Sequence, residues 1–112
     1  MTMFDDREKT FEKSFEHDQE LQFRVHARRN KMLGLWAASH MGLKGRDADS
    51  YARGILEAGI ERGNDETVMK KLAGDLSAKG VDISQHRLKK KMDELNDIAY
   101  RQVMMEPPPG SL

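Results

Sequence analysis

The sequence contains no cysteine among its 112 residues, which excludes both a disulfide framework and thiolate chemistry. It also lacks an excess of charge of either sign, because its formal net charge is +0 although 34% of its residues are charged. Proteins that bind nucleic acid in bulk present a strongly basic surface, so this balance argues against that class of partner. A chain of this length is expected to form one domain that buries roughly two-thirds of its unfolded surface.

Long apolar runs and familiar catalytic motifs are also missing. No run approaches the roughly 20 apolar residues of a membrane span, and the acidic N-terminus does not resemble a signal peptide. There is no GxSxG, HExxH or GxGxxG motif and no Walker phosphate loop. The histidines are not at the spacing of metal ligands; they are His17, His26, His40 and His86. The sequence therefore predicts a protein that is not an enzyme and holds no metal.

Apolar residues recur at helical spacing along most of the chain, and no segment shows sustained strand alternation. In the long first helix the repeat is carried by Leu21, Val25, Met32 and Trp36. Gly34 lies inside this pattern, and we expect it to allow a close contact with another helix. The pattern predicts an all-α protein, a four-helix bundle whose first helix is long.

Three further helices are predicted from their boundary signals. Asp47 is expected to cap a second helix over about 48–61, Asn64 or Asp65 a third, and Ser84 a fourth. The residues expected to face the core are Tyr51, Ile55 and Ala58 of the second helix, Val68, Met69, Leu72, Ala73 and Leu76 of the third, and Leu88, Met92, Leu95, Ala99 and Val103 of the fourth. Short connections between the helices favour an antiparallel bundle.

The first 20 residues have a helical pattern but no core of their own. One stripe consists of Phe4, Phe11 and Phe15, and a second of Glu8, Glu12, Glu16 and Glu20. Three phenylalanines cannot hold a fold, because ordering each residue costs about 1–2 kcal/mol, and glutamates one turn apart repel each other. We therefore expect residues 1–20 to be a flexible or partly helical arm that docks on another protein. Residues 21–106 are expected to form the bundle and residues 107–112 a disordered tail.

Two groups of basic residues are candidates for binding an anion. The first group lies in the long helix and consists of Arg24, Arg28, Arg29 and Lys31, with Arg24 and Arg28 stacked one turn apart. Charge patterning favours a solvated face that pairs with acids of a neighbouring helix, and the alternative is a clamp for phosphate or carboxylate. The second group follows the expected cap at the start of the fourth helix. Helix N-termini attract anions, and the alternative interpretation is a capped helix with an exposed basic face. The candidate nucleotide-binding residues are Arg24, Arg28, Ser84, His86, Arg87 and Lys90.

The stretch FDDREKTFEKSFEHDQELQFRVHARRNKMLGLWAA resembles the N-terminal signature of the zeta subunit of alphaproteobacterial F-type ATP synthase, an ATPase inhibitor family. The GND turn, the VDIS cap and the KKKMDEL segment are similar too. The resemblance implies a four-helix protein, monomeric when free, that inhibits ATP hydrolysis. Residues 1–19 would enter the catalytic head between the alpha, beta and gamma subunits and block rotation.

The resemblance also implies that the bundle binds ADP or ATP as a regulatory ligand, with no other cofactor. It places the protein in the bacterial cytoplasm, peripheral on the membrane-bound ATP synthase. In the arm, apolar pockets of the head would accept the phenylalanines, basic groups would meet the glutamates, and two aspartates would cap the docked helix. The candidate partner-binding residues are Phe4, Asp5, Asp6, Glu8, Phe11, Glu12, Phe15 and Glu16.

Two other functions remain open at this point. One is a bundle that senses adenine nucleotide and has weak or no inhibitory activity. The other is a coiled-coil element that self-associates through the arm, against which the glutamate stripe argues because like charges would face each other.

Overall fold

The computed structural model describes residues 2–106, and it describes side chains from residue 18 to residue 106. Four helices make up this part of the chain: α1 (Thr2–His40), α2 (Gly45–Arg62), α3 (Asp65–Ala78) and α4 (Gln85–Met105). The described residues contain no strand. The prediction of an all-α bundle with a long first helix is therefore confirmed, whereas the predicted tail at 107–112 lies outside the described residues.

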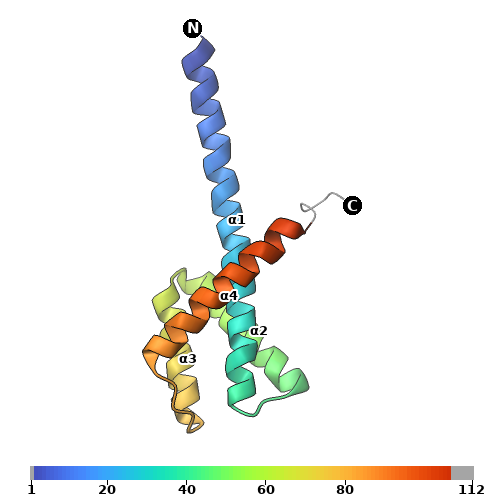
Figure 1. Ribbon diagram of the computed structural model, residues 1–112, viewed down its shortest axis with the longest axis vertical. Helices are drawn as coiled ribbons and strands as arrows, with labels where there is room; N and C mark the ends of the chain where they lie inside the picture. Colours follow the sequence, from blue (N-terminus) through green and yellow to red (C-terminus); the bar gives the residue numbers. More distant parts are fainter. Residues whose placement is uncertain (1, 107–112) are drawn as a thin grey trace.

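The first helix is much longer than the bundle that surrounds its C-terminal half. α1 contains 39 residues, which at 1.5 Å per residue is about 58 Å. Its N-terminal half projects beyond the other three helices, and the molecule measures 65 × 32 × 22 Å (Figure 1). The chain has neither glycine nor proline between residues 2 and 33, so nothing in the sequence interrupts the helix where the arm meets the bundle.

Every helix contributes to one main core. The largest fully buried side chains are Leu33, Ile55, Val68, Leu72, Leu76, Leu88 and Met92. Burial of the five apolar residues predicted for the fourth helix is confirmed, and so is burial of Val68, Leu72 and Leu76 in the third. In α1, however, Leu33 and Ala37 are fully buried, while Met32 and Trp36 are partly buried. The buried face of α1 is thus shifted by one residue from the expected repeat at positions 32–37, whereas Val25 is buried as expected.

α2 packs closely against this part of α1. A Cβ atom on Gly34 would lie 2.7 Å from the Cα of Ala52, which confirms the expected close helix contact. The absence of a side chain on Gly34 lets the backbone of α2 approach α1 here, beside the fully buried Leu33.

Two of the predicted helix caps are confirmed and one is wrong. Asn64 accepts a hydrogen bond from the backbone N–H of Thr67 (2.8 Å), and Ser84 accepts one from that of Arg87 (3.1 Å). The second helix instead begins at Gly45, after Lys44, whose side chain makes no capping hydrogen bond. Asp47 lies inside the first turn, where its charge still favours the helix dipole.

α4 crosses α1 obliquely, so its two halves serve different purposes (Figure 1). Its N-terminal half, with Leu88 and Met92, joins the main core. Its C-terminal half packs Ala99 and Val103 against Val25 of α1, with Leu21 beside them. This second, smaller cluster anchors α1 at the point where the helix leaves the bundle.

Candidate functional site

The projecting half of α1 carries all the candidate partner-binding residues. Their backbone is helical from residue 2 onward, but the side chains of these residues, Phe4 to Glu16, lie outside those that the structure describes. Along the described side chains, residues 18–20 are exposed, Leu21 is partly buried and Val25 is the first buried residue, at 4% exposure. The bundle core therefore begins just past the predicted end of the arm.

Two arginines at the base of the arm are paired with an acid. Arg28 forms an ion pair with Glu106, and Arg24 Nη2 lies 3.5 Å from Glu106 Oε2. The hydrogen bond from Arg28 holds the pKa of the Glu106 carboxyl below its usual value. Desolvation of the carboxylate opposes this shift, and the positive charges of both arginines support it. Arg24 and Arg28 are thus arranged as the charge-pairing interpretation expects. A phosphate bound by these two arginines would have to displace Glu106.

Arg29 differs from these neighbours because it is buried, with 3% exposure. Its guanidinium donates to the side chain of Asn30, to Asp65 Oδ1 at 2.6 Å and to Asn96 Oδ1 at 3.3 Å. One side chain of α1 is thereby joined to the first residue of α3 and to the middle of α4. Its role is to connect three helices, which the grouping of the arginines by sequence did not predict.

His26 lies beside this network. Partial burial and the positive charge of Arg29 lower the pKa of its imidazole, while the negative charge of Asp65 acts in the opposite direction. The neutral form is therefore favoured at the base of the arm.

The six candidate nucleotide-binding residues fall into two groups at opposite ends of α4. Arg24 and Arg28 lie beside Glu106, which follows the last residue of α4. The other four are exposed within the first two turns or at the cap before them; they are Ser84, His86, Arg87 and Lys90. The 21 residues of α4 span about 30 Å, so the two groups do not form one site.

Sequence reasoning missed two apolar surface features. A cavity of about 500 Å³ lies between α3 and α4, with Met69, Ala73, Leu88 and Met92 among its lining residues. Tyr100 and Met104, one turn apart on α4, are 48% and 55% exposed. A signal for the second feature was present, because both residues are apolar and lie outside the core repeat of their helix.

Within residues 2–106, no helix is both long and apolar enough to cross a membrane. Among the side chains described from residue 18 onward, no group of three or more histidines and acids is arranged to hold a metal ion.

Comparison with known proteins identifies a family model and a solved structure that this chain matches. The family model for ATPase inhibitor subunit zeta matches residues 1–102. No curated protein matches the sequence. A protein solved by solution NMR is 37% identical, with a TM-score of 0.65, and the match covers 75% of this chain and 95% of that one. The match with the family model confirms the resemblance seen in the sequence, and the chain belongs to the ATPase inhibitor subunit zeta family.

Proposed function

We propose that this protein inhibits ATP hydrolysis by F-type ATP synthase by inserting the arm, residues 1–20, into the catalytic head. Membership of an ATPase inhibitor family supports a regulatory function that involves the ATP synthase. The finer mechanism, entry between the alpha, beta and gamma subunits, is part of the proposal. It requires no covalent step, since a helix lodged between moving subunits obstructs them sterically.

The single observation that supports insertion best is the projection of α1 beyond the bundle (Figure 1). Residues 2–20 form about 28 Å of helix, long enough to reach well into another protein. The stripe of Phe4, Phe11 and Phe15 gives this helix an apolar side to bury, and burying one phenylalanine contributes about 1.5–3 kcal/mol. That gain offsets the loss of freedom when the arm is fixed in the complex.

The bundle, in this proposal, carries the arm and orients it. Val25 and Leu33 hold α1 on its apolar side, and Arg29 and Glu106 hold it through charged contacts. Because α1 is continuous, these contacts fix the direction in which the arm points.

The decisive comparison is between the unmodified chain and the full-length double variant Phe11→Ala, Phe15→Ala. We expect the double variant to inhibit ATP hydrolysis by a purified catalytic head at least about 10-fold less well, because two anchoring rings are lost. Its melting temperature should stay close to that of the unmodified chain. Leu35→Ala, which truncates a 36% exposed apolar residue far from the arm, is the matched control and should inhibit normally. Unchanged inhibition by the double variant would contradict insertion through the phenylalanine stripe.

Nucleotide binding by the bundle is a second proposal, supported by the basic residues around the exposed first turn of α4. Trp36 is a suitable reporter, because the ammonium of Lys91, early in α4, lies 5.9 Å from its ring centroid. Titration with ADP should change Trp36 fluorescence saturably, and the double variant Arg87→Ala, Lys90→Ala should abolish the change. If the unmodified chain gives no saturable change, the nucleotide proposal fails, whether or not the arm inhibits.

A further inference from the structure

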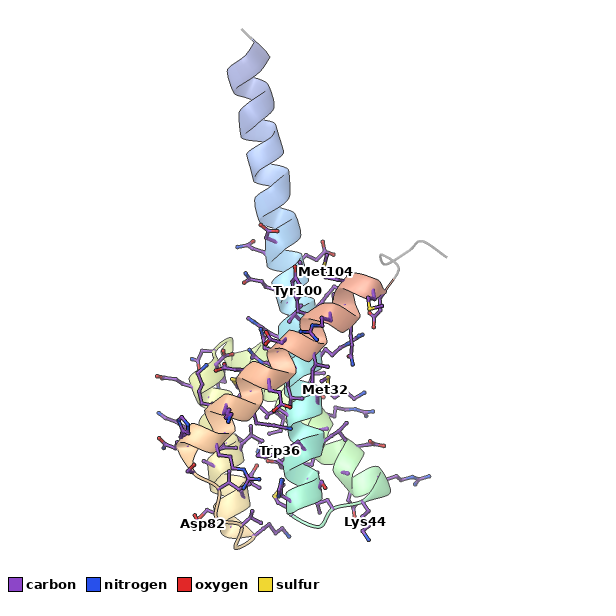
Figure 2. All side chains as sticks on the ribbon, viewed as in Figure 1. Met32, Trp36, Lys44, Asp82, Tyr100 and Met104 are labelled. Atoms are coloured by element: carbon purple, nitrogen blue, oxygen red, sulfur yellow. The ribbon has the colours of Figure 1, made fainter. Side chains whose placement is uncertain are left out.

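Exposed apolar side chains gather where α1 leaves the bundle. Tyr100 and Met104 follow Ala99 and Val103 of α4, the two residues buried against Val25 of α1. Figure 2 shows both side chains beside the part of α1 from which the arm continues. They point away from the core, so the packing of this chain does not explain why two large apolar residues stand here.

A cavity of about 370 Å³ lies between this region of α4 and the base of the arm. Tyr100 lines it from α4, and Leu21 and Val25 line it from α1. Asp18 and Gln22 contribute polar groups to its lining. An apolar surface bordered by polar groups is typical of a protein interface. We call Leu21, Tyr100 and Met104 the exit surface.

The continuity of α1 places the exit surface next to whatever encloses the arm. Phe15 and Leu21 lie six residues apart on one helix, which is about 9 Å along its axis. With no glycine or proline between them, the helix has no sequence feature that would let the bundle swing away. A protein that encloses the arm on all sides as far as Phe15 therefore ends about 9 Å from Leu21 along the helix axis.

We propose that the exit surface is a second contact between this inhibitor and the catalytic head, docking on an apolar patch beside the entrance that receives the arm. This inference rests on the proposed function of the arm, and it specifies which face of the bundle meets the ATP synthase. The partner patch should accept the Tyr100 ring and offer its hydroxyl a hydrogen-bond partner, while flexible Met104 fills the remaining space.

The test uses the full-length double variant Tyr100→Ala, Met104→Ala in the hydrolysis assay with the purified catalytic head. We expect the concentration for half-inhibition to rise about 10- to 100-fold, the usual effect of truncating central interface residues. Tyr100→Phe keeps the ring and should lose less than the double variant. Leu35→Ala, at the opposite end of the bundle, should leave inhibition unchanged, and melting curves should show that all variants are folded.

A photo-reactive benzoylphenylalanine in place of Tyr100 tests the same contact without relying on inhibition strength. It should cross-link to the catalytic head, whereas the same group in place of Leu35 should not. The inference is overturned if Phe11→Ala, Phe15→Ala abolishes inhibition while Tyr100→Ala, Met104→Ala inhibits normally and position 100 gives no cross-link. If Phe11→Ala, Phe15→Ala instead inhibits as strongly as the unmodified chain and still cross-links at position 100, the proposed function of the arm itself is contradicted. Self-association of the free chain that disappears in Tyr100→Ala, Met104→Ala would assign the surface to a second copy and also overturn the inference.

Discussion

Gly34 of α1 faces the backbone of Ala52 in α2 so closely that a Cβ on the glycine would lie 2.7 Å from the Ala52 Cα. Real Cβ atoms do not approach a backbone carbon to this distance, so a side chain at this position would force the two helices apart. The contact therefore fixes how deeply α2 sits against the helix that carries the arm.

Gly34→Ala should lower the free energy of unfolding by about 1–3 kcal/mol, because overpacking outweighs the better helix propensity of alanine. Gly54→Ala in α2 is the matched control, since a Cβ there meets nothing within 4 Å. We expect the control to stabilise the protein by up to about 1 kcal/mol. Urea denaturation of both variants measures the difference, and a stable Gly34→Ala protein would show that the helices separate at little cost.

Arg29→Ala should destabilise the bundle by about 3 kcal/mol, because it leaves the buried amide of Asn30 and the side chain of Asn96 without their donor. Arg29→Lys should not restore stability, since an ammonium cannot reproduce the planar set of donors that reaches three partners. Arg53→Ala, which removes an exposed arginine of α2, should change stability by less than about 0.5 kcal/mol. Equal melting temperatures for Arg29→Ala and Arg53→Ala would be inconsistent with a network that joins three helices.

The Glu106 contact should make stability depend on acidic pH. Its pKa is lowered by Arg28, so the folded protein binds fewer protons than the unfolded chain as the pH falls below about 4.5. The contribution of Glu106 is thus present above this pH and is lost as the pH falls through the lower pKa of the folded state. Glu106→Gln should be less stable than the unmodified chain at pH 7, and the difference should disappear in strong acid. A difference that stays constant with pH would mean that the ion pair contributes nothing.

His26 should add a smaller pH dependence nearer neutrality. Burial and Arg29 lower its pKa, so folding disfavours the protonated form. Stability should therefore fall as the pH drops below about 6.5, the ordinary pKa of histidine, and level off once the folded state is protonated. His26→Gln should remove this slope, and thermal melts between pH 5 and pH 8 provide the measurement. A slope that persists in the variant would have to come from another group.

Local patterns predicted some parts of this structure well. The repeat from Leu88 to Val103 identified every buried apolar residue of α4, because that helix buries one regular stripe along its length. Asn64 and Ser84 were recognised as caps because their hydrogen bonds are made within four residues.

Features that depend on contacts between helices were harder to predict. Leu33, and not Met32, is fully buried beside the close contact of α2 with Gly34. The spacing of apolar residues in the sequence does not indicate how closely two helices approach. Arg29 was grouped with exposed arginines, because its partners Asp65 and Asn96 are distant in sequence. The exit surface was not predicted for the same reason, since Tyr100 and Leu21 line one cavity only because α4 crosses α1.

The central claim, that the arm inhibits and the bundle carries it, is tested most directly by a chain that begins at Leu21. This chain keeps every residue that the structure describes as buried, from Val25 onward, and should therefore fold. Its effect on ATP hydrolysis by the purified catalytic head should be measured beside that of the full-length chain. We expect the full-length chain to inhibit and the shortened chain, at equal concentration and with a cooperative melting curve, to leave hydrolysis unchanged. Equal inhibition by the two chains would contradict the claim.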